Sequence, residues 1–322
     1  MQQTHPAASA TLLADSRNTL GEGATWCDAT HALYWTDIEG ARLWRCRADG
    51  SDLAHWPMPE RLACFALTRD PGVLLVGLAT HLAFFDLRSG AFTRIADVEP
   101  ELPTRLNDGR CDPHGAFVFG MKDEGGDPPR AVGGFYRLNA DLTLERLALP
   151  RAAIANSIAF SPDGSRMYFC DSLVREIFVC DYRAGGEVAN VRSFARLTDA
   201  DGDPDGSTVD RDGGLWNAQW GGGRVVRYGP DGVETERVAV PTAQPSCAAL
   251  DGEGRLYVTS ARVGLSDDAH AGGVFVARTR YAGTPTARFA VKQSLSECLC
   301  VRHKLMAKEP RYATQTQGRS DD

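Results

Sequence analysis

The stretch Ser161-Pro-Asp-Gly-Ser-Arg-Met-Tyr-Phe169 joins a tight turn to a run of apolar and aromatic residues. Asp-Gly pairs favour turns because glycine accepts positive φ at no steric cost and aspartate caps the turn with its own side chain. The aromatic and apolar run that follows is typical of a β-strand. Each copy of this unit therefore predicts a turn followed by a strand.

The unit recurs along the chain, which makes the period more informative than any single copy. Six copies begin at residues 28, 70, 112, 161, 210 and 251, so the gaps are 42, 42, 49, 49 and 41 residues. A period of about 40 to 50 residues that carries several short strands is typical of a β-propeller with four strands per blade. A β-sandwich or barrel would instead show strands about 8 to 12 residues apart without a longer period. We predict an all-β, six-bladed propeller with four-stranded antiparallel blades.

The six units cover roughly residues 15 to 290 and leave the last blade one strand short of four. A propeller has to protect the edges of its sheets, so the run Ala10-Thr-Leu-Leu-Ala14 is expected to supply the outer strand of the last blade and to close the ring. The predicted organisation is an N-terminal lead over residues 1–10, a propeller over 11–289, and a C-terminal appendage over 290–322. We expect the appendage to be partly disordered.

Composition narrows the function classes. The chain has 322 residues, 43% hydrophobic and 24% charged, and a formal net charge of -7, which excludes a collagen, a coiled coil or wholesale disorder. The acidic balance argues against a nucleic-acid partner, because phosphates call for a basic face. No run reaches the roughly 18 apolar residues of a membrane span, and residues 1–13 lack a secretory signal. We expect a cytoplasmic protein without a membrane partner, as a monomer or weak oligomer.

Cysteine usage fits a reducing compartment. The nine cysteines form an odd number and include no Cys-x-x-Cys pair. This pattern is unlike a disulfide framework or a structural zinc site. Most of them have apolar neighbours, which predicts buried, reduced thiols.

Four polar residues stand at matching offsets before the repeat starts. Glu22 precedes its start by six residues, and each of the others precedes its own by five: Asn107, Asn156 and Asp205. Equivalent positions in successive blades lie at one height around the channel axis. The same offset in the second and sixth units gives Phe65 and Ser246, which predicts a partial polar ring with one apolar wall.

Carboxylates and amides that converge in a channel need a partner, because desolvated and like-charged groups are costly. A bound cation supplies one. The oxygen ligands Glu22, Asn156 and Asp205 favour a hard ion such as Ca²⁺, Mg²⁺ or Mn²⁺, with Zn²⁺ tolerated. The alternative is that each residue only caps a turn or bonds to neighbouring backbone.

The motifs resemble the senescence marker protein (regucalcin), gluconolactonase and sugar-lactonase family of six-bladed propellers, over roughly residues 12 to 290. The resemblance lies in Gly21-Glu-Gly23, Arg105-Leu-Asn-Asp-Gly109, Asn156-Ser157 and Pro204-Asp-Gly206. It implies one divalent metal ion held by Glu22, Asn156 and Asp205, with Arg105 and Asn107 in contact with the substrate. The family hydrolyses aldonolactones, and its animal members also carry a calcium-binding label.

The chemistry of lactone opening suits these residues. Hydrolysis needs an activated water and stabilisation of charge on the carbonyl oxygen, and a divalent ion can serve both needs. Asp205 is the candidate general base, and Arg105 can donate a fork of hydrogen bonds to sugar hydroxyls or to the carboxylate product. The stretch Gly120-Met-Lys-Asp-Glu-Gly-Gly126 departs from the family pattern. Its Glu124 is the nearest equivalent of the family's acidic substrate contact, and Lys122 can point into the pocket.

We therefore predict metal-dependent hydrolysis of a pentono- or hexonolactone to the open aldonic acid. The alternative is a non-catalytic propeller that binds calcium or another metal, or a protein partner. An esterase or organophosphatase is a further alternative, but such sites recruit more acidic ligands or a histidine. Two other features are expected to be structural: Asp171 and Ser172 as hydrogen-bonding links between blades, and Trp220 as packing between blades.

Overall fold

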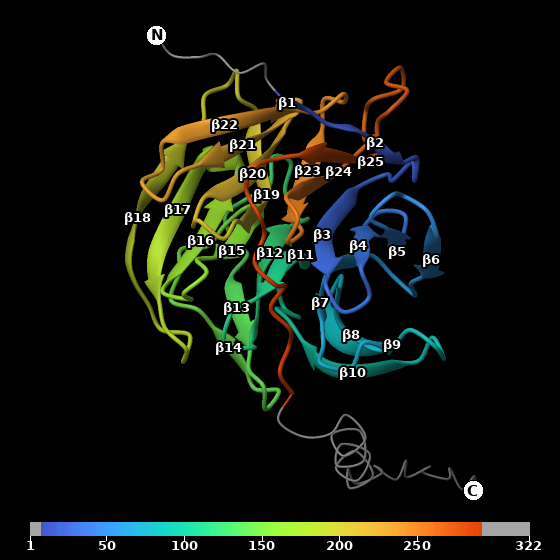
Figure 1. Cartoon of the computed structure of the whole chain (residues 1–322). Coiled ribbons are helices and arrows are strands. Elements are labelled where there is room, and N and C mark those ends of the chain that lie inside the picture. The colour runs from blue at the N-terminus through green and yellow to red at the C-terminus, as the bar shows by residue number, and fades with distance from the viewer. Residues whose placement is uncertain (1–7, 292–322) are drawn as a thin grey trace, which may run out of the picture.

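The computed structural model describes residues 8–291, and these fold into six β-sheets arranged in a ring around a common axis (Figure 1). The helical structure in this range is one short 3₁₀ turn, η1 (Ser172–Val174). The six predicted blades are all present, each with a meander of antiparallel strands. The prediction of an all-β, six-bladed propeller is confirmed.

The strands of a blade follow one another from the channel outwards. The first three blades contain β3 (Gly21–Cys27), β4 (Ala32–Asp37), β5 (Arg42–Arg47) and β6 (Ala54–Pro57); β7 (Leu62–Leu67), β8 (Val73–Leu78), β9 (His81–Asp86) and β10 (Phe92–Asp97); and β11 (Thr104–Cys111), β12 (Phe117–Asp123), β13 (Phe135–Leu138) and β14 (Leu144–Arg146). The other three contain β15 (Ala155–Phe160), β16 (Arg166–Asp171), β17 (Glu176–Tyr182) and β18 (Val188–Arg196); β19 (Asp203–Val209), β20 (Leu215–Trp220), β21 (Arg224–Tyr228) and β22 (Glu234–Ala239); and β23 (Pro245–Leu250), β24 (Arg255–Ser260) and β25 (Val274–Arg278).

The N-terminal strand closes the ring. Strand β2 (Thr11–Ala14) pairs antiparallel with β25, with Leu12 opposite Phe275, and so becomes the fourth strand of the sixth blade. This confirms the predicted closure. The two-residue strand β1 (Ala8–Ser9), which the sequence did not predict, pairs parallel with β22 and adds a fifth strand to the fifth blade.

Each innermost strand contains one extra residue relative to its partner. In the first blade the register passes from Glu22 opposite Thr36 to Thr25 opposite Tyr34, and the same irregularity recurs in β7, β11, β15, β19 and β23. Such β-bulges re-aim side chains locally. The backbone is left-handed at two equivalent positions, Gly23 with φ of 62° and Ser157 with φ of 60°. The bulges therefore lie where the sequence places its polar ring.

Apolar side chains pack between neighbouring blades. One cluster joins Leu75 and Leu82 of the second blade to Phe117 and Phe119 of the third, all fully buried. The seven cysteines among residues 8–291 are all free and buried, as predicted. Cys298 and Cys300 lie outside the described residues.

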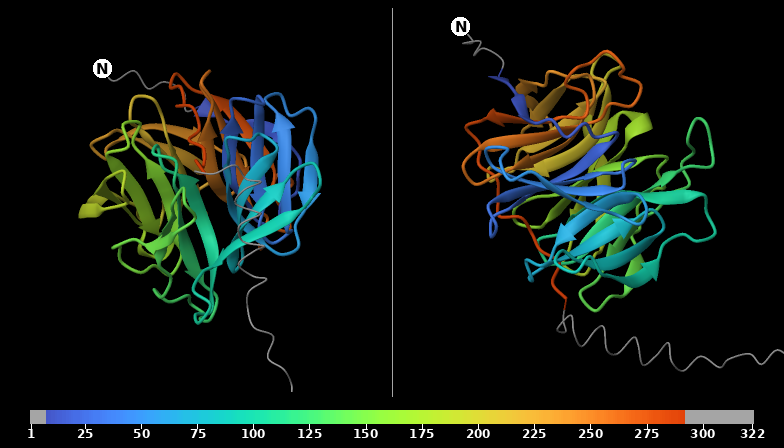
Figure 2. Two further views of the ribbon diagram at one scale, coloured as in Figure 1. Left: turned by 90° about the horizontal axis from the view of Figure 1, so that it is seen from below. Right: turned by 90° about the vertical axis from the view of Figure 1, so that its right-hand side faces the viewer.

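A segment after β25, here named the strap (residues 281–290), crosses one face of the propeller. Its backbone donates from Gly283 to Asp251, from Phe289 to Leu67 and from Ala290 to Gly115, so it touches the sixth, second and third blades. It runs in front of the channel in Figure 1 and along one edge in the right-hand view of Figure 2. Most of the predicted appendage, residues 292–322, lies outside the described residues.

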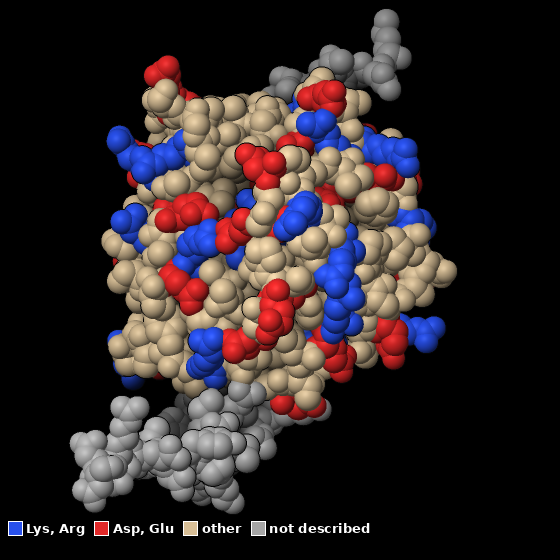
Figure 3. Space-filling view, turned by 180° about the vertical axis from the view of Figure 1, so that it is seen from behind, with Lys and Arg blue, Asp and Glu red and all other residues tan. Residues whose placement is uncertain are grey.

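The outer surface carries both charges. On the face shown in Figure 3, acidic and basic side chains are interspersed. Within residues 8–291, the chain forms no helix with the length and apolar character that a membrane crossing requires.

Candidate active site

The predicted polar residues meet at one end of the channel. Glu22 of β3, Asn107 of β11, Asn156 of β15 and Asp205 of β19 line a cavity of about 370 Å³, here named the acidic cavity. They lie within the innermost strands, at the bulges. Phe65, the predicted apolar wall, lines the opposite end of the channel instead, because its bulge comes earlier in the strand, between Leu62 and Cys64.

Two carboxylates share the floor of the acidic cavity. Burial raises the pKa of both carboxyl groups, and the negative charge of Asp108 raises them further. Glu22 and Asp205 lie close enough for the negative charge of Glu22 to raise the pKa of the Asp205 carboxyl group. The Oδ1 atom of Asp205 is buried without a hydrogen-bond partner. This environment is unfavourable for two anions and favourable for a cation.

The donor set fits a hard divalent ion. Glu22 and Asp205 offer carboxylate oxygens, and the Asn156 Oδ1 atom retains a lone pair after it accepts one hydrogen bond from Asn107. Within residues 8–291, no three His, Cys, Asp or Glu side chains are grouped as metal ligands, so an amide oxygen would have to complete the set. The orphaned Asp205 oxygen is the observation that most favours this site.

Asn107 and Asn156 are held in fixed orientations. The Nδ2 atom of Asn107 donates to Oδ1 of Asn156 at 3.0 Å and to the Ala155 carbonyl at 3.0 Å. The Nδ2 atom of Asn156 donates to Oγ of Ser172 at 2.9 Å. Both amides are buried, with 8% and 5% exposure for Asn107 and Asn156. Their oxygen and nitrogen ends are therefore set by neighbours in the third and fourth blades.

Arg105 is a buried cation beside this pair, only 1% exposed. Its Nη1 atom donates to Oδ1 of Asn107 at 2.7 Å and to the Leu106 carbonyl at 2.8 Å, and its Nε atom lies 3.3 Å from Oε1 of Glu124. Burial lowers the pKa of the guanidinium, but arginine stays charged in proteins. Arg105 lines the acidic cavity, as the sequence predicted for a substrate-binding residue.

Lys122 belongs to the lining of the acidic cavity, whereas Glu124 does not. Lys122 lines the acidic cavity, where burial and the charge of Arg105 lower the pKa of its ammonium group. Both carboxylate oxygens of Glu124 accept from Arg61, at 2.6 and 2.7 Å, and Glu124 lies behind Arg105 outside the cavity lining. A direct contact between Glu124 and substrate stays a prediction.

Three further residues lie at or beside this site, and none of them is among the predicted ligands or substrate contacts. Asp108, next to Asn107, is buried and accepts from the Ile158 backbone at 2.7 Å; strand alternation would send it away from the channel, but the bulge lets both residues turn inwards. Ser172 lines the cavity and also links blades, as expected, by donating to the Pro204 carbonyl at 2.8 Å. Trp220 lines the cavity as well, beside the exposed apolar residues Leu173 and Val263.

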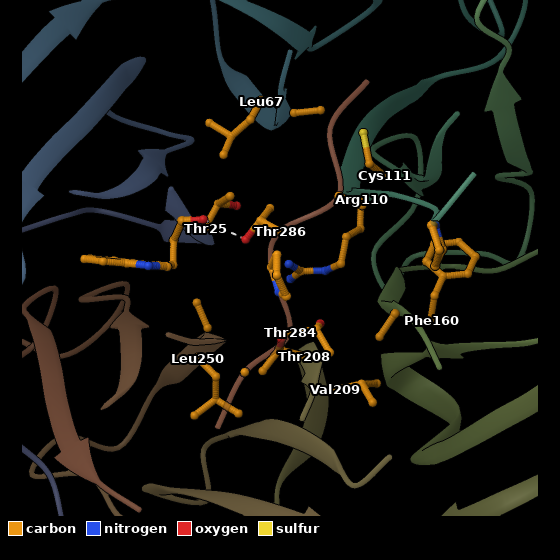
Figure 4. A pocket seen from close by; sticks show the side chains of 18 of the residues that line it. Thr25, Leu67, Arg110, Cys111, Phe160, Thr208, Val209, Leu250, Thr284 and Thr286 are labelled. Carbon is orange, nitrogen blue, oxygen red and sulfur yellow. Dashed lines mark hydrogen bonds between the residues drawn. The ribbon is translucent and has the colours of Figure 1, made fainter. Parts of the chain in front are cut away.

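The opposite end of the channel holds a second cavity of about 360 Å³, with Thr284 and Thr286 of the strap across it (Figure 4). Among residues 8–291, Arg110 is the one charged residue in its lining, and it points towards the middle of the channel. Its Nη2 atom donates to the Ser207 carbonyl at 2.8 Å, which ties the third blade to the fifth. This cavity offers no carboxylate ligand, so the acidic cavity is the candidate active site.

The chain is similar to known sugar lactonases and to a regucalcin. The chain is 88% identical over 295 residues to an L-arabinolactonase of Azospirillum brasilense, covering 90% of this chain and 98% of that one. It is 34% identical over 262 residues to the pentonolactonase XacC of Haloferax volcanii, covering 78% and 84%. A crystal structure of a calcium-binding regucalcin from Agrobacterium tumefaciens matches with a TM-score of 0.81 and 30% identity, over 88% of this chain and 98% of that one.

The family assignment covers the site itself. A family model described as SMP-30/gluconolactonase/LRE-like region matches residues 20–262. That range contains Glu22, Arg105, Asn107, Asn156 and Asp205, and it spans the six innermost strands. The chain belongs to the SMP-30/gluconolactonase/LRE-like family.

Proposed function

We propose that the protein hydrolyses a five-carbon sugar lactone, of the L-arabinonolactone type, to the open aldonic acid. The observation that carries this proposal is the convergence of Glu22 and Asp205 beside Asn107, Asn156 and Arg105 in one cavity. The similarity to an L-arabinolactonase and a pentonolactonase supports the substrate class. A cavity of about 370 Å³ suits a monosaccharide lactone.

Glu22, Asn156 and Asp205 would hold one divalent cation, with Ca²⁺, Zn²⁺, Mg²⁺ and Mn²⁺ as the candidates. When bound, such an ion supplies Lewis-acid polarisation of the lactone carbonyl and lowers the pKa of water. The calcium-binding regucalcin structure supports a cation in this fold.

Asp205 is the proposed general base. Its carboxylate would accept a proton from the attacking water while the water oxygen bonds to the carbonyl carbon of the lactone. The bond between that carbon and the ring oxygen then breaks, and the ring oxygen takes the proton held by Asp205 to become a hydroxyl. The products are a free hydroxyl and a carboxylic acid on the same open chain, and the acid ionises to the carboxylate by releasing its proton to solvent. Burial of Asp205 keeps bulk water away from this proton transfer.

The walls of the acidic cavity would orient the substrate. Arg105, Asn107 and Lys122 form a polar side, and the donors of Arg105 and Lys122 suit sugar hydroxyls and the developing carboxylate. Trp220 and Leu173 belong to an apolar side that suits the C–H face of the ring. A lactone held between them exposes its carbonyl towards the carboxylates.

A panel of pentono- and hexonolactones, followed by titration of the acid released, tests the proposal. We expect L-arabinonolactone to open far faster than its spontaneous rate and faster than the hexonolactones, with activity lost in a chelator. Asp205→Asn should lose activity with the fold intact. If no lactone is hydrolysed with any of the four cations supplied, the proposed lactonase activity is wrong.

The same experiment addresses a second candidate function. The calcium-binding description of the regucalcin structure and the orphaned Asp205 oxygen favour a cation site even without catalysis. A non-catalytic propeller would show a melting temperature that rises with cation but no lactone opening.

A further inference from the structure

A continuous series of polar contacts runs along the wall of the acidic cavity from the second blade to the fifth. It begins at Arg61, passes through Glu124 to Arg105, and continues through the two amides. It ends where Asn156 donates to Ser172 and Ser172 donates to the Pro204 carbonyl. We name this series the relay: Arg61, Glu124, Arg105, Asn107, Asn156, Ser172 and the carbonyl of Pro204.

From Arg105 onwards, each residue of the relay donates a hydrogen bond to the next one, and these donor and acceptor roles cannot be reversed. Arginine can only donate hydrogen bonds, so the end of Asn107 that faces Arg105 must be its oxygen. The nitrogen end of Asn107 then faces Asn156 and requires an oxygen there. At the far end a carbonyl can only accept, so the Ser172 hydroxyl donates to Pro204 and is left to accept from Asn156.

The contacts at the Arg105 end and at the Pro204 end of the relay therefore require the same orientation of the Asn156 amide group. Its Oδ1 atom is directed towards Asn107 and the cavity, and its Nδ2 atom towards Ser172. A flipped amide would bring two donors together at Asn107 and would place its oxygen against a hydroxyl that already donates elsewhere. Oxygen is the only end of an amide that can bind a cation.

At the other end of the relay, Arg61 is linked through Glu124 to Arg105, the proposed substrate-binding residue. Arg61 holds Glu124 by two hydrogen bonds, and Glu124 forms an ion pair with the buried Arg105. Arg61 also lies 3.4 Å from Glu39, so it joins acidic residues of the first and third blades. Its own side chain stays outside the cavity lining.

We propose that Arg61 and Ser172 are positioning residues at the two ends of this relay. Ser172 fixes the amide oxygen of Asn156 for a cation, and Arg61, acting through Glu124, fixes Arg105 for the substrate. The inference rests on the proposed lactonase function for its substrate end. Neither residue carries out a chemical step.

Ser172 is tested by cation binding alone. The affinity of the chelator-treated protein for Mn²⁺, and separately for Ca²⁺, is measured by isothermal titration calorimetry. Ser172→Ala should bind each ion at least about tenfold more weakly than wild type, because the residue that holds a metal ligand in place has been removed. Ser172→Thr, which keeps the hydroxyl, should bind more tightly than Ser172→Ala. Equal affinity in wild type and Ser172→Ala, or no binding of either ion to wild type, overturns this end of the relay.

Arg61 is tested by separating KM from kcat. Arg61→Met should raise KM for L-arabinonolactone about five- to tenfold with little change in kcat or melting temperature, and Arg61→Lys should restore part of the loss. Arg45→Met is the matched control, because Arg45 forms a similar half-exposed ion pair, 2.7 Å from Asp52, away from the cavity. An unchanged KM in Arg61→Met, or an equal rise in the control, overturns this end.

The two proposals fail in different ways. If wild type opens no lactone, the proposed function is wrong, while the Mn²⁺ and Ca²⁺ titrations still decide the role of Ser172. If wild type is active and both variants match it in cation affinity and KM, the relay is wrong and the function stands.

Discussion

Asn107 and Asn156 meet across the boundary between the third and fourth blades, where Nδ2 of the first donates to Oδ1 of the second at 3.0 Å. The two residues are 49 positions apart, the same distance as the starts of their repeats. Equivalent positions on neighbouring innermost strands are therefore in direct contact. The candidate active site is a product of the repeat: the first, third, fourth and fifth blades each contribute one side chain from the matching offsets, namely Glu22, Asn107, Asn156 and Asp205.

Cation binding should stabilise the protein through Glu22. A ligand at 100 times its Kd adds about 2.7 kcal/mol to the free energy of unfolding, so saturating Mn²⁺ or Ca²⁺ should raise the melting temperature of chelator-treated wild type by several degrees. Glu22→Gln should lose this shift. Glu39→Gln is the control, since Glu39 lines the same cavity but is not a predicted ligand. A shift retained in Glu22→Gln would exclude Glu22 as a ligand.

Lys122 should contribute to substrate binding more than to the chemical step. Its ammonium group faces the acidic cavity from the polar side, so Lys122→Met should raise KM about tenfold, equivalent to about 1.4 kcal/mol, with a small change in kcat. Lys122→Arg keeps the charge and should recover part of the affinity. The KM and kcat of each variant are measured by steady-state kinetics. A variant with a lower kcat and an unchanged KM would contradict a role of Lys122 in substrate binding.

Trp220 should act as the apolar wall of the acidic cavity. Trp220→Ala should raise KM by roughly two- to twelvefold, because an aromatic contact of this kind contributes about 0.5–1.5 kcal/mol, while Trp220→Phe should lose less. Quenching of tryptophan fluorescence on addition of the aldonic acid product should disappear in Trp220→Phe. Unchanged quenching in that variant would place the ring away from the ligand.

Ring closure by β2 should be essential to stability. Removal of residues 1–14 exposes the edge of β25 and uncovers Trp35 and Tyr257, which pack in one core cluster with Ala14. We expect a protein that aggregates or melts many degrees lower, as seen by calorimetry and light scattering. Removal of residues 1–7 alone is the control. A truncated protein as stable as wild type would contradict closure through this strand.

The repeat made the fold predictable. Asp-Gly turns at a constant period identify the blades, and the missing strand points to residues 10–14. Strand β1 escaped prediction because a pair of residues, Ala8 and Ser9, is too short to show a strand pattern. The family and the lactonase class are confirmed by the comparisons. The cytoplasmic location and oligomeric state stay predictions.

The site was predictable only in part. Glu22, Asn107, Asn156 and Asp205 precede their repeat starts by five or six residues, and the structure places them in one cavity. Asp108 could not be identified in this way, since the bulge that turns it inwards leaves no mark in the alternation of β11. Ser172 and Trp220 follow or end second strands, outside the offset, so only tertiary structure brings them to the cavity.

The rate of L-arabinonolactone opening by wild type and by Asp205→Asn, each with Mn²⁺ and with Ca²⁺, tests the central claim most directly. Removal of a positioned general base typically costs about 10²- to 10⁴-fold. We expect rapid, cation-dependent acid release by wild type and at least a hundredfold lower kcat in Asp205→Asn, with an unchanged far-ultraviolet circular dichroism spectrum. Equal rates in the two proteins, or no enzymatic opening by wild type, would contradict the account.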